Sequence, residues 1–216
     1  MHYSLNEIYH FSNVRGKGDQ YMDWFAIGNK AIANQGGIRS RTFWNKHKLK
    51  VPYNIPSLIV LVSNNHEKDQ SVNPWDPAEL NETTGQLIYK GDSRKYKKNT
   101  EDRDPRSKLE HQGNKQFRKI EQILITENKI WLPPLLYFSS VSMGEYAFKG
   151  LYYPNKITSY FDESPYVEKE NYKLHCQRLD DKTIPLEWLR DRCLVNTEPF
   201  DFDKSEGPSS WNQRDM

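Results

Sequence analysis

The stretch Ser57–Ser63, SLIVLVS, decides the fold class of this chain. Its centre is an unbroken run of Leu, Ile and Val. A continuous β-branched run without polar alternation predicts a strand that is buried on both faces. With 216 residues the chain is long enough to cover both faces of such a sheet without disulfide bonds.

Further strand signals surround this stretch, and they are broken by turn residues. The clearest is Gln86–Lys90, QLIYK, which lies between Gly85 and the pair Gly91-Asp92. Helix signals are few: Lys115–Thr126, which we expect to run into a strand over QILIT, and Pro185–Arg192. The pattern predicts a mainly β (α+β) fold, an antiparallel barrel or pseudobarrel with one or two short helices. Further strands are expected over Ile130–Ser139, Glu145–Tyr152 and Tyr172–Arg178.

Composition sets the domain organisation and excludes several classes of protein. We expect one domain over residues 1–195 and a polar linker or tail over 196–216. Cys176 and Cys193 lie in no metal-ligand spacing, which predicts buried reduced thiols and neither a structural metal nor a cofactor. No stretch is long and apolar enough to span a membrane or to act as a secretion signal. The expected location is the cytoplasm of a prokaryotic cell.

The formal net charge of +2 hides an uneven distribution along the chain. Arg15–Lys50 holds eight Lys and Arg against two Asp and Glu, and Ser93–Lys119 holds ten against four. Both stretches read largely as loops with interspersed aromatic residues. Two basic stretches of this kind indicate a surface that binds the phosphates of a nucleic acid, although charged loops are also common in other proteins.

The residues bear on two kinds of catalytic site. The chain contains no phosphate-binding glycine motif, which argues against a nucleotide-dependent enzyme. Glu127 and Lys129 with an upstream Asp104 match the pattern of a PD-(D/E)xK nuclease, in which carboxylates hold Mg²⁺. Such residues are also ordinary in the turn that is predicted here, so we keep the nuclease as an alternative.

Eight short motifs occur in a characteristic order along the chain. They are GNKAIANQGGIRSR at Gly28–Arg41, LIVLVS at Leu58–Ser63, PWDPAELNETTGQLIYKGDSRK at Pro74–Lys95, GNKQF at Gly113–Phe117, LPPLLYF at Leu132–Phe138, FKGLYYP at Phe148–Pro154, ENYKLHCQRLD at Glu170–Asp180 and IPLEWLRD at Ile184–Asp191. Together they resemble the N-terminal recognition domain of the AspBHI-type modification-dependent restriction endonucleases, relatives of MspJI. The likeness covers roughly residues 21–192.

The resemblance implies a fold and a mode of DNA binding. The fold is an SRA-like β-pseudobarrel, akin to the plant B-three DNA-binding fold, which holds duplex DNA between loops and flips a methylated cytosine into a pocket. A flipped base needs an aromatic stacking surface and a polar group on its Watson–Crick edge. The candidates in this chain are Trp75, Asp76, Tyr89 and Asp92. Core packing of Trp75 and Tyr89, and a turn-forming role for Asp92, are the alternatives.

Basic residues supply the candidates for the other DNA contacts. In GGIRSR the glycines allow close approach to a groove, and Arg39 and Arg41 can each donate two hydrogen bonds to guanine. A buried structural ion pair is the alternative for Arg39. Lysines that we expect to contact the phosphate backbone, and so to position the protein without reading sequence, are Lys46, Lys48, Lys95, Lys97 and Lys98.

The sequence therefore predicts a non-catalytic chain that recognises double-stranded DNA as part of a restriction endonuclease. It would read a short site with or without 5-methylcytosine, and a nuclease domain would lie in the same parent chain. The alternatives are a small Mg²⁺-dependent nuclease and a DNA-binding regulatory module without a nuclease.

Overall fold

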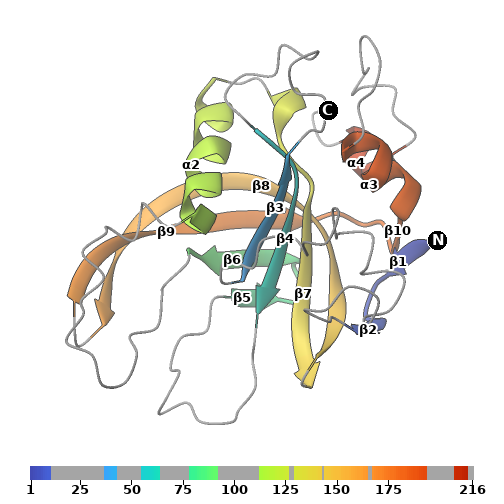
Figure 1. Ribbon diagram of the computed structural model, residues 1–216, viewed down its shortest axis with the longest axis horizontal. Coiled ribbons are helices and arrows are strands. Elements are labelled where there is room, and N and C mark those ends of the chain that lie inside the picture. The colour runs from blue at the N-terminus through green and yellow to red at the C-terminus, as the bar shows by residue number, and fades with distance from the viewer. Residues whose placement is uncertain are drawn as a thin grey trace.

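A computed structural model describes residues 1–10, 37–42, 55–63, 78–91, 112–126, 129–142, 144–164, 167–193 and 207–213. These residues form a strongly curved sheet with helices on two sides (Figure 1). The strands, in chain order, are β1 His2–Ser4, β2 Ile8–His10, β3 Ile38–Thr42, β4 Pro56–Ser63, β5 Ala78–Asn81, β6 Gln86–Lys90, β7 Leu135–Ser142, β8 Glu145–Ser164, β9 Val167–Arg178 and β10 Thr183–Pro185. The helices are α2 Gln112–Ile125, the 3-10 helix η3 Lys129–Trp131, α3 Leu186–Cys193 and α4 Ser209–Gln213.

The main sheet has the strand order β3-β4-β7-β8-β9-β6-β5, and β2 pairs with β8 beside this path. All of its pairs are antiparallel except β4 and β7, which run parallel from the register Ile59 with Leu135. Within this sheet the long strands β8 and β9 are strongly bent (Figure 1). This curvature brings β6 opposite β4, and the Tyr89 hydroxyl donates a 2.6 Å hydrogen bond across to the Val62 carbonyl.

Strand β4 is buried along its whole length because each of its faces contributes to a different core. Ile59 and Leu61 belong to an inner core, which α2 covers with Phe117, Ile120 and Ile123. The alternate residues belong to an outer core, which β1, β2, α3 and α4 cover. Side chains with a period of two therefore divide between two cores, as a strand covered on both faces requires. The outer-core members on β4 are Leu58, Val60 and Val62.

The expected mainly β pseudobarrel is confirmed, with three differences in detail. The sheet is mixed rather than wholly antiparallel because of the parallel β4–β7 pair. The predicted strand over QILIT is wrong, since these residues continue α2 to Ile125. The predicted strand over Ile130–Ser139 is wrong at its start, where η3 extends to Trp131, and β7 begins only at Leu135.

Each of the two cores contains one of the two cysteines. Cys176 of β9 belongs to the inner core and Cys193 of α3 to the outer core, and both are buried free thiols. Burial raises the pKa of both thiols. The prediction that both cysteines are buried is confirmed.

The end of the chain packs against the domain. Trp211 of α4 is fully buried, and its ring lies 5.8 Å from the ring of Trp188. The Arg192 guanidinium lies 5.6 Å from the Trp211 ring and donates to the carbonyls of Ser57 and Leu132. Residues 207–213, which fall in the predicted linker or tail, are thus held on the outer core.

Candidate nucleic-acid interface

One rim of the pseudobarrel brings together the described residues that border three predicted DNA-binding segments. The amide of Val62, near the end of β4, donates a 2.7 Å hydrogen bond to the Gly37 carbonyl, just before β3. Ala78, the first residue of β5, pairs with Tyr89 near the end of β6. Because the Tyr89 hydroxyl bonds to Val62, all four strands meet here. We call this arrangement the Tyr89 rim; it consists of Gly37, Val62, Ser63, Ala78, Tyr89 and Gly91.

Most of the predicted site residues lie in segments that begin or end at the Tyr89 rim. Ser63 and Ala78 border residues 64–77, and Gly91 borders residues 92–111. Candidates that lie outside the described residues, so that nothing tests their roles, are Lys46, Lys48, Trp75, Asp76, Asp92, Lys95, Lys97 and Lys98. Of these, Lys46 and Lys48 follow the end of β3 that is away from the rim.

Tyr89 is the centre of the rim and part of the inner core. Its side chain is fully buried, and its ring makes edge contacts with Phe117 and Tyr137 at centroid distances of 6.4 and 6.3 Å. A Cβ atom at Gly37 would collide with both the Tyr89 hydroxyl and the Val62 carbonyl oxygen. In this structure the group that approaches the glycine of GGIRSR is therefore this tyrosine. A base could stack on the Tyr89 ring only if neighbouring groups moved.

A buried hydrogen bond between two hydroxyl groups lies next to the bond of Tyr89 to Val62. The hydroxyls of Ser63 and Tyr137 share a 2.7 Å hydrogen bond, and Ser63 also reaches the Ser139 hydroxyl at 3.5 Å. These bonds link the last residue of β4 to the middle of the parallel strand β7. Buried hydroxyl groups that are hydrogen-bonded in this way make the rim rigid.

Arg39 and Arg41 lie on the outer-core face of β3, but they have different surroundings. They pair with Val60 and Leu58 of β4, both of which are outer-core residues. Arg39 is half-buried near the rim; burial lowers the pKa of its guanidinium, and Tyr146 and Tyr89 oppose this shift. A guanidinium stays charged despite such a shift. Guanine reading by Arg39 remains a prediction.

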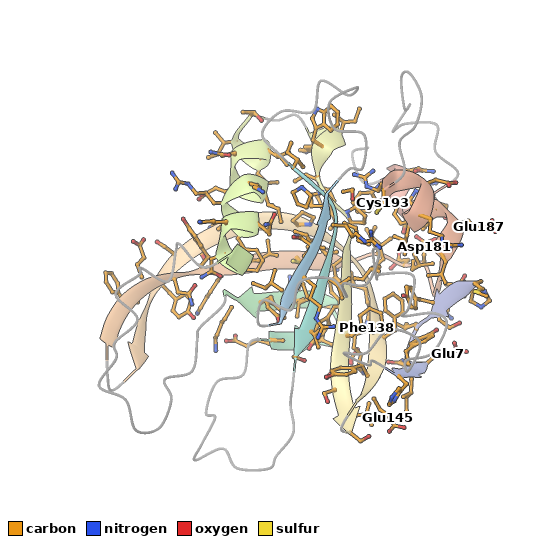
Figure 2. All side chains as sticks on the ribbon, in the orientation of Figure 1. Glu7, Phe138, Glu145, Asp181, Glu187 and Cys193 are labelled. Carbon is orange, nitrogen blue, oxygen red and sulfur yellow. The ribbon has the colours of Figure 1, made fainter. Side chains whose placement is uncertain are left out.

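Arg41 lies at the far end of β3, below α3. Only 4% of its surface is exposed; burial lowers the pKa of its guanidinium, and the nearby Cys193 opposes this shift. Its backbone carbonyl accepts a 3.3 Å hydrogen bond from the Ser57 hydroxyl, which also donates to the Cys193 sulfur. Figure 2 labels Cys193, the last residue of α3, and Phe138, which belongs to the same outer core. Strand pairing separates Arg41 from Tyr89, because Arg41 pairs with Leu58 whereas Tyr89 is bonded to Val62, four residues further along β4. The contact of Arg41 with guanine stays an untested prediction.

A buried amide cluster fixes the two ends of the segment 92–111. The Asn114 amide of α2 donates to the Asn171 Oδ1 atom at 2.9 Å, and the Asn171 amide donates to the Gly91 carbonyl at 3.2 Å. The Gly91 amide donates in turn to the Tyr172 carbonyl at 2.7 Å. A Cβ atom at Gly91 would collide with the oxygens of both asparagine side chains. The chain therefore leaves the sheet and returns to α2 at one point, next to Tyr89.

Sequence reasoning missed Asn171 and Asn114 as residues of this site. The two asparagines are fully buried. In the sequence they stand among charged residues, ENYK and GNKQ, where an asparagine usually faces solvent. The only signal was the position of Gly113-Asn114 directly before an apolar helical pattern.

The described residues contain no candidate metal site. Among them, no three His, Cys, Asp or Glu side chains lie close enough to hold a metal ion. For the nuclease alternative, Glu127 and Asp104 fall outside the described residues, and Lys129 is exposed at the start of η3. No helix among these residues is long and apolar enough to cross a membrane.

Comparison with solved structures identifies the class of fold. The structure aligns with the DNA modification-dependent restriction endonuclease AspBHI with a TM-score of 0.66 and 24% identity over 98% of this chain and 89% of that chain. The DNA-recognition domain of the cytosine modification-dependent restriction endonuclease LpnPI aligns with a TM-score of 0.58 and 19% identity, over 98% of this chain and 85% of that chain. The structure of MspJI in complex with a 27-mer oligonucleotide aligns with a TM-score of 0.69 and 16% identity, over 98% of this chain and 51% of that chain.

These likenesses show that the chain shares the pseudobarrel fold of these proteins. The chain belongs to the family of the restriction endonuclease AspBHI N-terminal domain, whose sequence profile matches residues 3–214. No curated protein sequence gave a significant match. The resemblance that the motifs predicted is confirmed, and the profile extends it over almost the whole chain.

Proposed function

We propose that this chain is a double-stranded-DNA-recognition domain of a modification-dependent restriction endonuclease, and that it reads a short site that contains a modified cytosine. The observation that carries the proposal is the Tyr89 rim. Segments 64–77 and 92–111 contain the base-pocket candidates Trp75, Asp76 and Asp92 and the lysine candidates Lys95, Lys97 and Lys98. Hydrogen bonds and strand pairing in the rim bring the residues that flank these segments together at one end of the pseudobarrel. Membership of the AspBHI N-terminal family supports it.

The arrangement suits the division of labour in DNA recognition. Flexible lysine side chains contact phosphates and set the register, whereas groups held by a rigid scaffold read the bases. Trp75, Asp76 and Asp92 are the pocket candidates that lie close to the rim along the chain. The buried Tyr89 links the strands of the rim through its hydrogen bond to Val62. The parent protein supplies cleavage from a nuclease domain outside this chain.

The test is a binding panel with the purified chain. Matched duplexes carrying cytosine, 5-methylcytosine or 5-hydroxymethylcytosine in a set of sequence contexts are titrated at fixed salt. We expect tighter binding to one modified form in one context. Equal affinity for all three forms in every context would contradict modification reading, and failure to bind any duplex would contradict DNA recognition.

A cleavage assay separates this proposal from the nuclease alternative. The chain is incubated with plasmid DNA and Mg²⁺, with Glu127→Ala as the matched variant. We expect no cutting by either protein. Metal-dependent cutting that Glu127→Ala abolishes would show instead that the chain is itself a nuclease.

A further inference from the structure

A basic surface lies on the outer face of strands β6, β9 and β8. Along these strands Leu87, Tyr89 and Leu174 point into the inner core, so the alternate residues point outward. Strand pairing places Lys90 opposite Lys173, and Lys173 opposite Thr158. The next row places His175 opposite Lys156. We call these five residues, Lys90, Lys156, Thr158, Lys173 and His175, the outer basic face.

The residues of the outer basic face are close enough to act on one anionic partner. Neighbouring strands lie about 4.8 Å apart, and residues two positions apart along a strand are separated by roughly 7 Å. The side chains also contact one another or their neighbours. Thr158 shares a 2.9 Å hydrogen bond with His175, and the Lys173 ammonium lies 5.0 Å from the centre of the Tyr160 ring.

The local potential on this face is positive. Burial and the ammonium groups of Lys156 and Lys173 lower the pKa of His175, and Glu79 only partly opposes them. Glu79, which lies on β5, forms a 3.1 Å ion pair with Lys90 at the β5 side of the face. Lys156 is exposed and Lys173 is half-exposed, so both ammonium groups are available to a partner.

The outer basic face is continuous with the Tyr89 rim. Lys90 directly precedes Gly91 of the rim, and the Gly91 amide is bonded to Tyr172, the residue beside Lys173. A duplex that is held at the rim and extends toward β9 would therefore pass over a surface of the right charge. Sequence reasoning did not identify this face, because its cations are spread over three separate segments.

We propose that the outer basic face binds the phosphate backbone of duplex DNA outside the recognised site, through Lys156 and Lys173 above all. The proposal rests on the proposed function, since it needs DNA at the Tyr89 rim. It adds a sequence-independent contact that increases affinity and leaves the choice of site to the rim. Such contacts release counterions and are therefore sensitive to salt.

The experiment compares two lengths of duplex. The tightest-binding duplex of the panel is used both as a minimal site and with flanks of roughly two helical turns, about 20 base pairs, on each side. Wild type, Lys156→Gln, Lys173→Gln and the double variant are titrated over a range of salt. Lys182→Gln, an exposed lysine beside β10, is the matched control for loss of charge.

We expect the two variants to weaken binding to the long duplex and to leave binding to the minimal site unchanged. Each lost contact should lower the salt slope by about 0.9, which amounts to roughly an eightfold loss of affinity at 0.1 M salt relative to 1 M. Lys173→Arg keeps the charge and should retain the affinity, which separates the charge from the packing of Lys173 on Tyr160. Lys182→Gln should behave as wild type.

A second readout reports on this face alone. NMR titration of His175 in the presence of the long duplex should show a higher pKa than in its absence, because a nearby phosphate stabilises the imidazolium against Lys156 and Lys173. Unchanged affinity in the double variant, or an equal loss on both lengths of duplex, would overturn the proposal while the proposed function stands. A wild-type chain that binds neither duplex would overturn both.

Discussion

At the scale of single residues, the contact between Gly37 and Tyr89 holds the rim together. A side chain at Gly37 has no room, because the Tyr89 hydroxyl and the Val62 carbonyl oxygen occupy its place. We expect Gly37→Ala to lower the free energy of unfolding by about 1–3 kcal/mol, the usual cost of overpacking. Urea denaturation followed by circular dichroism measures this loss.

Tyr89→Phe is the companion variant, because it removes the hydroxyl and keeps the ring. It should lose about 1 kcal/mol, the net value of one hydrogen bond to Val62. The double variant should lose less than the sum of the two, because the new methyl group then meets only the Val62 carbonyl. Strict additivity, or a Gly37→Ala variant as stable as wild type, would contradict the close contact.

Single residues were also the hardest feature to predict from the sequence. Tyr89 was singled out as an aromatic residue for a base pocket, with core packing as the alternative, and the structure buries it. Its neighbours Gly37, Val62 and Tyr137 come from three distant segments. No local pattern specifies such contacts, since they depend on which strands pair. Arg41 is a similar case, because it is buried and its electrostatic neighbour Cys193 comes from the distant helix α3.

At the scale of elements, local patterns predicted strands well where burial and propensity agree. The bounds of β6, Gln86–Lys90, were predicted in full, and β4 differs by one residue. The Ile-rich end of α2 misled the prediction because Ile favours strands in isolation. Packing overrides that preference, since Phe117, Ile120 and Ile123 all meet the inner core from one face of the helix.

The amide cluster at the junction of β6, β9 and α2 leads to a prediction at this scale. Asn171→Ala removes two hydrogen bonds of the cluster. The Asn114 amide loses its acceptor on Asn171, and the Gly91 carbonyl loses its donor on Asn171. We expect a loss of about 1–3 kcal/mol in the free energy of unfolding. We also expect weaker DNA binding with a smaller salt slope, because the cluster fixes both ends of the segment that contains Lys95, Lys97 and Lys98.

Asn81→Ala is the matched control for the amide cluster. Asn81 accepts hydrogen bonds from the amides of Thr83 and Thr84 in the exposed turn between β5 and β6. Its loss should reduce stability slightly and leave DNA binding unchanged. The two properties are measured separately, by urea denaturation and by titration with the best duplex. DNA binding that stays intact in a folded Asn171→Ala protein would show that the cluster serves stability alone.

At the scale of the whole molecule, the sequence predicted the class of fold and not its arrangement. SLIVLVS indicated a strand buried on both faces, and the structure shows the reason: β4 lies between an inner and an outer core. The parallel pairing of β4 with β7 and the packing of Trp211 from the far end of the chain could not be predicted. The strand pair joins Ile59 to Leu135, which are 76 residues apart, and Trp211 packs on Trp188 and Arg192. In neither case do the local sequences determine which segments meet.

Because β4 contributes side chains to both cores, the two cores should unfold as one unit. Trp211 packs on Trp188 and Arg192 in the outer core, and Arg192 is bonded to the carbonyl of Ser57 at the start of β4. Trp211→Ala should therefore lower the stability of the whole domain by about 3–5 kcal/mol, the usual cost of removing a buried aromatic side chain.

The buried cysteines report on the two cores separately, Cys193 on the outer and Cys176 on the inner. In single-cysteine proteins made with Cys176→Ala or Cys193→Ala, thiol labelling measures how often each core opens. One cooperative unit predicts that Trp211→Ala speeds labelling of both thiols by the same factor, on the order of a hundredfold or more for a loss of 3 kcal/mol. Faster labelling of Cys193 alone would mean instead that α3 and α4 open as a separate layer while the inner core and the Tyr89 rim stay folded.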